Sequence, residues 1–329
     1  MQIPLVDIEP LSSPSGDTSQ VAKEIHRACR EHGFFYVVGH GVSKKLQDSL
    51  ESLSWKFFNQ PEQVKSQIAM ELGGKAWRGY FPVLSELTSG KPDIKEGLYF
   101  GEELSAHDPR VKSGLPLHGA NLFPDIPDFK QSVIDYLNSM SQLGRLLMRG
   151  IAISLDLPDK HFEQTIMSDP LILFRIFHYP AKSSVTDPDA HWGVGEHTDY
   201  GVLTILKQDA VGGLQVFNKN RWIDAPYLEN SFVCNIGDML DRMTGGYYRS
   251  TPHRVQSNTN KGRLSFPFFY DLNFTAVPAD LNLKHLGQER ALSYTRWDQS
   301  DIQSYTGTYG QYLIQKVGKV FPMLKDNLG

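Results

Sequence analysis

Gly-Val-Gly-Glu-His-Thr-Asp-Tyr-Gly, residues 193–201, is the stretch that decides the fold, and it runs directly into the apolar segment 202–206. It places His197 and Asp199 two positions apart, and side chains at i and i+2 of an extended strand point to the same face. His253 follows 56 residues after His197. This separation favours a site assembled across a β-barrel over a helical HExxH zinc site, a motif that the sequence lacks.

The chemistry of these three side chains indicates a metal site. Two imidazoles and one carboxylate that leave open positions are the ligand set that suits Fe(II) in non-haem oxygenases. We therefore predict that His197, Asp199 and His253 bind Fe(II). A single His-x-Asp pair also occurs by chance, on surfaces or in hydrogen-bonded cores. The prediction therefore rests on the whole set and on its strand-like context.

A second pair of residues with period-two spacing, Arg263 and Ser265, follows His253. A guanidinium group binds a carboxylate through two parallel hydrogen bonds, and a hydroxyl group two residues later adds another. An acid bound there could present its other end to the metal. The alternative is a surface arginine in an ordinary salt bridge. Pro267 indicates that this strand lies at a sheet edge or is irregular.

Together these motifs resemble those of the iron(II)/2-oxoglutarate-dependent oxygenases of the isopenicillin N synthase-like superfamily. The resemblance covers nearly the whole chain, because segments 3–7, 33–42, 57–61 and 121–124 are similar to landmarks of that family's N-terminal region. It implies Fe(II) as the metal, 2-oxoglutarate as co-substrate and O2 as oxidant. It also implies a soluble small-molecule oxidoreductase.

The same resemblance implies roles for the anion-binding residues. Tyr179 matches a tyrosine that in relatives often helps to hold the co-substrate, so Arg263, Ser265 and Tyr179 are expected to bind the C5 carboxylate of 2-oxoglutarate. The implied reaction oxidises an unactivated C–H bond by hydroxylation, ring closure or desaturation, and it releases succinate and CO2. His178 has no counterpart in the motif, and we predict that it is structural.

A looser resemblance, to the bacterial ethylene-forming enzyme branch, concerns the loop at residues 85–93. The corresponding loop in that branch contacts an amino-acid substrate. The match implies that Glu86 and Thr88 contact the substrate, with Arg175 and Tyr200 beside them. The alternatives to substrate contact are that Glu86 is a solvated loop acid and that Arg175 forms a salt bridge in the core.

Strand spacing supports the position of Arg175. It precedes Tyr179 by four residues, so both side chains are expected on one face of a strand and in one cavity. Together with Arg78 and Glu86, Arg175 indicates a small amino-acid-derived metabolite that carries carboxylates and an amine.

The predicted fold is mainly β, with a double-stranded β-helix (jelly-roll) core and an N-terminal α-helical region. Residues 1–165 are expected to form a mixed α/β region, and residues 166–329 the jelly-roll core with a C-terminal helix, as one compact unit. Residues 73–125 are expected to form loops over the site. Apolar spacing predicts helices near 21–29 (capped at Thr18 or Ser19), 46–57, 133–151 and 311–317, and strands near 34–38, 214–217, 221–223 and 231–236.

Composition excludes some classes of protein. The chain has 329 residues and a formal net charge of −4 with dispersed Lys and Arg, which gives no electrostatic footprint for nucleic acid. Cys29 and Cys234 lie in apolar contexts and are predicted to be buried thiols in a reducing compartment. The first residues do not have the pattern of a signal or transit peptide, and no apolar stretch approaches the roughly 20 residues that span a bilayer. We therefore expect a cytoplasmic monomer that binds no membrane.

Two other functions are compatible with these motifs. An iron oxidase of the same fold that does not use 2-oxoglutarate can keep the arginine–serine pair, and succinate release would separate it from the oxygenase. A non-catalytic jelly-roll binding protein would need no set of three convergent ligands, and iron content would test it. No nucleophile elbow, P-loop or Rossmann fingerprint is present to indicate another enzyme class.

Overall fold

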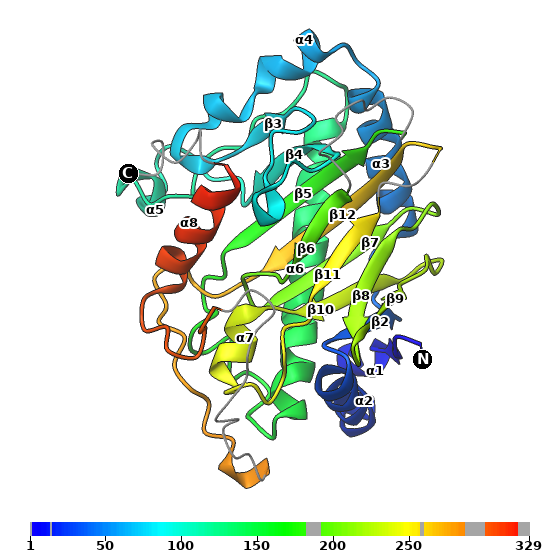
Figure 1. Cartoon of the computed structure of the whole chain (residues 1–329). Coiled ribbons are helices and arrows are strands. Elements are labelled where there is room, and N and C mark those ends of the chain that lie inside the picture. The colour runs from blue at the N-terminus through cyan, green and yellow to red at the C-terminus, as the bar shows by residue number, and fades with distance from the viewer. Residues whose placement is uncertain (1, 14, 182–191, 257–259, 287–299, 322–329) are drawn as a thin grey trace.

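Two β-sheets face each other (Figure 1), and side chains of both line one cavity. The computed structural model describes residues 2–13, 15–181, 192–256, 260–286 and 300–321. In spatial order, the larger sheet contains β1 (Leu5–Asp7), β2 (Phe34–Val38), β10 (Phe232–Ile236), β7 (Leu203–Gln208), β12 (Arg263–Tyr270), β5 (Ile172–Tyr179), β4 (Glu96–Gly101) and β3 (Gly79–Phe81). The smaller sheet contains β6 (Trp192–His197), β11 (His253–Gln256), β8 (Leu214–Asn218) and β9 (Arg221–Asp224). This is the mainly β, jelly-roll architecture that the sequence predicts.

Helices cover the outer face of the larger sheet. The α-helices are α1 (Glu9–Ser12), α2 (Thr18–Glu31), α3 (Lys44–Phe58), α4 (Glu62–Lys65), α5 (Pro109–Lys112), α6 (Phe129–Ser154), α7 (Asp238–Met243) and α8 (Tyr309–Val320). Short 3-10 helices lie at Ser66–Ile68, Met70–Ala76, Thr88–Gly90 and Lys284–Leu286. Figure 1 shows α6 running behind the strands, with α8 at the opposite end of the sheet from α2. No helix of the described residues is long and apolar enough to span a membrane.

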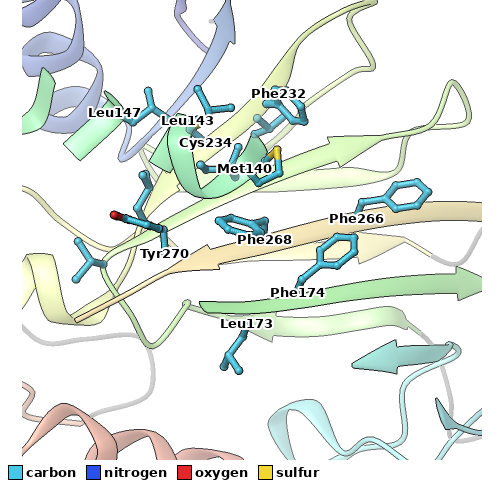
Figure 2. Close-up of a cluster of buried hydrophobic side chains, with 14 of the residues drawn as sticks. Met140, Leu143, Leu147, Leu173, Phe174, Phe232, Cys234, Phe266, Phe268 and Tyr270 are labelled. Atoms are coloured by element: carbon cyan, nitrogen blue, oxygen red, sulfur yellow. The ribbon is translucent and has the colours of Figure 1, made fainter. Parts of the chain in front are cut away.

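Helix α6 carries the apolar stripe predicted from its sequence, and this stripe forms the main core. Met140, Leu143 and Leu147 are buried against side chains of the larger sheet (Figure 2). A methyl group at Gly144 would lie only 2.6 Å from the Tyr270 ring, so the absence of a side chain allows close helix–sheet packing. On the order of 2 kcal/mol of stability comes from each large aliphatic side chain buried in this way.

Alternation along β5 divides the core from the cavity. Phe174 points toward α6, whereas Leu173 points to the other side of the sheet (Figure 2). Leu173 and Arg175 line the cavity, as the period-two rule requires. The strand therefore presents one face to the hydrophobic core and the other face to the site.

Two local expectations are wrong, and a third is right in part. Helix α2 is capped by Asp17, which accepts hydrogen bonds from the next turn, and not by Thr18 or Ser19. The segment 73–125 is not only loops, because β3 and β4 pair with β5 and extend the larger sheet. Pro267 lies in β12 between β5 and β7, so the expectation of an edge strand is wrong. The alternative expectation of an irregular strand is confirmed, because the ladder with β5 has no assigned partners for Phe266 and Pro267, where the N–H of proline is missing.

Strands from both halves of the sequence share the larger sheet, since β1 to β4 pair directly or in series with β10 and β5. The predicted boundary at residue 165 falls between α6 and β5 and stays a prediction. Cys29 and Cys234 are both buried free thiols, as expected.

Candidate metal and co-substrate site

His197, Asp199 and His253 converge at the end of the smaller sheet. His197 ends β6, His253 begins β11, and the two residues are paired across the antiparallel ladder. One ligand atom from each of the three residues lies within 4.8 Å of the others. The strand pairing explains why residues far apart in the sequence meet, and it forms the three-sided ligand set that suits Fe(II).

Backbone carbonyl groups orient both imidazoles. His197 donates from Nδ1 to the carbonyl oxygen of Gly195 at 2.8 Å, and His253 donates to that of Thr251 at 3.1 Å. These bonds fix the protonated nitrogen and leave Nε2 as the lone-pair donor. The Nε2 atoms then lie 3.8 Å and 3.7 Å from Asp199 Oδ1.

The carboxylate of Asp199 is fixed in the same way. Its Oδ2 accepts hydrogen bonds from Thr204 Oγ1 at 2.5 Å and from Asn235 Nδ2 at 2.7 Å. Its Oδ1 therefore faces the two histidines. Phe34 packs edge-on against the His253 ring at 5.2 Å between centroids, so β2 also supports the site.

The protonation states fit a metal site. Burial and the neighbouring His253 lower the pKa of His197 to about 3, so its imidazole is neutral at physiological pH. Burial alone would raise the pKa of Asp199, but the two histidines and the bonds from Asn235 and Thr204 outweigh it and lower that pKa. Neutral imidazole and ionised carboxylate are the forms that bind a metal.

The anion-binding residues meet at the other end of the cavity. Arg263 and Tyr179 are paired across β12 and β5, and the Arg263 guanidinium lies 4.7 Å from the Tyr179 ring centroid. The hydroxyl oxygens of Tyr179 and Ser265 are 3.3 Å apart. All three side chains are buried, which excludes the alternative of a surface salt bridge for Arg263.

Arg263 has unused donors. Its side chain is 1% exposed, and its closest carboxylate oxygen, on Asp209, is 3.8 Å from Nε. Within the described part of the chain, Nε and Nη1 have no hydrogen-bond partner. Burying guanidinium donors without partners is costly, so a carboxylate bound in this cavity fits the site.

One cavity joins the two ends and has space for a small molecule. Side chains of both sheets line it. Side chains of α8, namely Tyr309, Leu313, Val317 and Val320, form part of its wall. Tyr309 donates to Asp271 Oδ2 at 2.6 Å, which fixes α8 to the end of β12. The C-terminal helix predicted near residues 311–317 is therefore present and lies beside the cavity.

The residues predicted to contact substrate also line this cavity. Arg175, Glu86, Thr88 and Tyr200 are all present in its wall. Glu86 is buried and not a solvated loop acid, since it pairs with Lys95 at 2.8 Å and accepts from Tyr99 at 2.9 Å.

Arg175 combines aromatic packing with an unused donor. Its guanidinium lies 4.3 Å from the ring centroid of Tyr99 and 4.9 Å from that of Phe269. Its Nη1 is 3.7 Å from Glu86 Oε1, and its Nε has no hydrogen-bond partner among the described residues. The side chain is therefore held in place with one donor available.

Arg78 and His178 lie elsewhere. Arg78 donates to the carbonyl of Leu117 and does not line the cavity, so its predicted link to the substrate is wrong. His178 donates to Glu96 at 2.7 Å and packs beside Phe58 at 5.2 Å, on the side of β5 away from the cavity. It therefore lies outside the convergent His-Asp-His set, and its structural role stays a prediction.

Sequence reasoning missed two charged residues in or beside the cavity wall, Asp93 and Lys95. Lys95 is 1% exposed and its Nζ lies 2.6 Å from Asp93 Oδ2. The signal in the sequence was the charged pair at i and i+2 directly before β4, because this spacing places both side chains on one face.

Two family models match most of the described fold. Residues 3–126 match "non-haem dioxygenase in morphine synthesis N-terminal", and residues 171–272 match "2OG-Fe(II) oxygenase superfamily". The second match contains the convergent His197, Asp199 and His253, together with Arg263 and Ser265.

Several curated proteins are similar over nearly their whole length. A probable iron/ascorbate oxidoreductase of Dictyostelium discoideum is 49% identical over 99% of this chain and 97% of that protein. A 1-aminocyclopropane-1-carboxylate oxidase of Dictyostelium mucoroides is 38% identical over 98% and 95%. A homoarginine-6-hydroxylase of Oryza sativa subsp. japonica is 36% identical over 98% of each.

A solved structure agrees with this arrangement. A full-length Neurospora crassa protein in complex with alpha-KG and thymine superimposes with a TM-score of 0.77 at 28% identity, over 96% of each chain.

Proposed function

The chain belongs to the 2OG-Fe(II) oxygenase superfamily, and from that premise we propose that it oxidises an unactivated C–H bond of a small, amino-acid-derived carboxylate metabolite. It is an Fe(II)- and 2-oxoglutarate-dependent dioxygenase. The proposal concerns the substrate class and the residues that bind each reactant.

We assign the metal to His197, Asp199 and His253. Each imidazole has one nitrogen bound to a carbonyl group and the other directed toward Asp199 Oδ1. The second oxygen of Asp199 is already bonded to Thr204 and Asn235. Three donor atoms are therefore directed toward one point, which supports this assignment.

We assign the C5 carboxylate of 2-oxoglutarate to Arg263, Ser265 and Tyr179. The unpartnered Nε and Nη1 of Arg263 support binding of a carboxylate, because each is a buried N–H donor that needs an acceptor. A side chain at Gly213 would lie 2.7 Å from Arg263 Nη1, so the glycine leaves room for the guanidinium.

We assign the substrate to Arg175, Glu86, Thr88 and Tyr200. The unpartnered Nε of Arg175 supports binding of a substrate carboxylate. Glu86 Oε1, which is 3.7 Å from Arg175 Nη1, is the carboxylate oxygen that we assign to a substrate amine. The aromatic rings around Arg175 keep its guanidinium in place without neutralising it.

The reaction balances without another reductant. Bound Fe(II) supplies O2 activation, which couples decarboxylation of 2-oxoglutarate to oxidation of the substrate. Hydroxylation converts 2-oxoglutarate, O2 and R–H into succinate, CO2 and R–OH. Desaturation or ring closure instead removes two hydrogen atoms from the substrate and forms water. The protein orients the C–H bond through Arg175, and the apolar side chains of α8 limit the access of water to the cavity.

The observation that carries this proposal is that unpartnered arginine donors and a convergent His-Asp-His set line one buried cavity. The test is a screen of amino acids and their carboxylate derivatives for substrate-stimulated succinate formation, with product masses recorded. A gain of one oxygen identifies hydroxylation, and a loss of two hydrogens identifies desaturation or ring closure. Stimulation only by compounds without a carboxylate would overturn the proposed substrate class.

The similarity to 1-aminocyclopropane-1-carboxylate oxidases favours an iron oxidase that does not use 2-oxoglutarate as the second candidate function. The buried, unpartnered Arg263 supports the first candidate more strongly, because an oxidase without this co-substrate leaves its donors unused. Product formation in the absence of 2-oxoglutarate, with no succinate released, would establish the oxidase instead.

A further inference from the structure

Among the described strands, β6 lies at the edge of the smaller sheet and is paired with β11. Its other edge is covered by the loop that precedes β4. Ile94 N donates to the carbonyl of Trp192 at 2.9 Å, and Gly195 N donates to Asp93 Oδ1 at 3.2 Å. An edge strand without such partners would expose unpaired backbone groups. The loop therefore fixes the strand that carries His197.

Gly195 is hydrogen-bonded both to Asp93 and to the candidate metal ligand His197. The N–H of Gly195 is bonded to Asp93, and its carbonyl group accepts the hydrogen bond from His197 Nδ1 at 2.8 Å. The backbone of one glycine thus connects a buried carboxylate with the imidazole. A displacement of Gly195 changes the direction of the His197 ring and hence of its Nε2.

Lys95 in turn fixes Asp93. Its Nζ lies 2.6 Å from Asp93 Oδ2 and 2.8 Å from Glu86 Oε2, and Thr88 also donates to Asp93 Oδ2 at 2.5 Å. Asp93, Lys95 and Glu86 are all at most 3% exposed. Removing one partner of such a buried network leaves an uncompensated charge, so the remaining groups must move or bind elsewhere.

We propose that Asp93 and Lys95 are positioning residues of the metal site, which orient His197 through the backbone of Gly195. This inference rests on the proposed assignment of His197 as an iron ligand. Neither residue belongs to the convergent set of His197, Asp199 and His253. Their effect is on the direction of the imidazole, and groups that orient a ligating histidine typically change metal affinity or activity by about 10- to 100-fold.

The test measures metal binding directly, without turnover. Apoprotein is titrated anaerobically with Co(II), whose visible absorption reports both occupancy and ligand geometry. Asp93→Ala and Lys95→Met are each expected to raise the Co(II) dissociation constant about tenfold or more and to alter the absorption of the bound ion.

Lys65→Met is the matched control. Lys65 is also a buried lysine paired with a carboxylate, Glu96 Oε2 at 2.5 Å, but neither residue lines the cavity. Its loss should lower the thermal midpoint as much as Lys95→Met does, while the Co(II) constant stays within about twofold of wild type. A general loss of packing would shift the Co(II) constants of both lysine variants equally, and that result would overturn the proposal.

The same titration separates this inference from the proposed function. His197→Ala must lose Co(II) binding, and unchanged binding in that variant would refute the iron site itself. If His197→Ala loses Co(II) but Asp93→Ala binds it like wild type, only the positioning role is refuted. Should Asp93→Ala fail to fold, Asp93→Asn keeps the shape of the side chain and should still weaken Co(II) binding about threefold or more. An unchanged constant in Asp93→Asn overturns the proposal as well.

Discussion

Lys95 and Glu96 are neighbours in the sequence, yet they belong to two buried ionic clusters on opposite faces of the sheet. On the outer face, Glu96 accepts from Lys65 at 2.5 Å, Tyr80 at 2.6 Å and His178 at 2.7 Å. On the cavity face, Lys95 pairs with Glu86 and Asp93, beside Arg175. We call these the outer cluster and the cavity cluster.

The clusters differ in whether their hydrogen bonds are complete. Both oxygens of Glu96 have partners from the chain itself, so the outer cluster is closed. In the cavity, Nε of Arg175 and Nε and Nη1 of Arg263 have none among the described residues. Buried polar groups are nearly always satisfied, so groups left without partners in the wall of a cavity indicate where ligands bind. Burial of charge alone does not distinguish a binding site from a structural cluster.

The largest expected effect is the loss of iron, and it distinguishes His197 and His253 on the cavity face from His178 on the outer face. His197→Ala, Asp199→Ala or His253→Ala should abolish turnover and iron binding, because two ligands cannot hold the metal. His178→Ala should keep its iron and lose about 1–3 kcal/mol of unfolding free energy, since Glu96 loses a buried partner. Iron content and urea unfolding measure the two effects. Metal loss in His178→Ala with retention in His253→Ala would reverse our assignment of the two faces.

The next effect concerns Arg175. Arg175→Ala should lower kcat/KM for the identified substrate about 30-fold or more, since truncating one partner of a buried, hydrogen-bonded charge pair costs about 2–5 kcal/mol. Iron binding and slow, uncoupled decay of 2-oxoglutarate should persist. Glu86→Gln should act in the same direction if the substrate carries an amine. Succinate and product are quantified separately to measure coupling.

Arg254→Ala is the control for this prediction. Arg254 also stacks on aromatic rings, 4.2 Å from the centroid of Trp192 and 3.9 Å from that of Trp222, but these rings do not line the cavity. Arg254→Ala should leave the ratio of product to succinate unchanged. Kinetics of Arg175→Ala that match wild type would remove Arg175 from the substrate site.

A smaller effect is expected at the co-substrate. Arg263→Lys keeps the charge but loses the two-pronged contact, so 2-oxoglutarate affinity should fall about tenfold or more, equivalent to roughly 1.5–3 kcal/mol. The equally buried Arg78 also has two unpartnered nitrogens among the described residues but lies outside the cavity. Arg78→Lys should therefore leave the 2-oxoglutarate dependence unchanged. If Arg263→Lys behaves like Arg78→Lys, the missing hydrogen bonds do not mark a co-substrate site.

The smallest expected effect concerns the pH dependence of the free energy of unfolding, and it tests the outer cluster. Burial alone would raise the pKa of Glu96, but hydrogen bonds from His178, Lys65 and Tyr80 hold it below its usual value of 4.5. A carboxyl group with a lowered folded-state pKa stabilises the fold fully above its unfolded-state pKa, and this contribution disappears as the pH falls through the folded-state value. Below about pH 4.5, wild type should lose up to about 1.4 kcal/mol per pH unit more than Glu96→Gln.

Urea unfolding over that acidic range measures the slopes. Glu71→Gln, a change at an exposed glutamate, is the control and should keep the wild-type slope. Equal slopes in Glu96→Gln and wild type would mean that the outer cluster does not stabilise the fold through its charge.

Local spacing was sufficient for much of the fold. The apolar period of α6 and the strand-like runs at β2, β8 and β10 appear where the sequence predicts them. These features depend on residues within one or two turns of a helix or along a few residues of a strand. The same reasoning did not find the N-cap of α2, which is Asp17 and not Thr18 or Ser19. Neighbouring Asp, Thr and Ser residues are nearly equal in free energy as caps, so the local sequence does not decide between them.

For the site, the sequence alone determined the residue types and the period-two spacings of His197 with Asp199 and of Arg263 with Ser265, since these depend on strand geometry. Only the tertiary structure decided that Pro267 is central, that β3 and β4 join the sheet, and that Asp93 and Lys95 reach the strand of His197. The reason is physical: strand order, burial and the pairing of charges arise from contacts between segments far apart in the chain, and no local pattern specifies which of two adjacent charges will face the cavity.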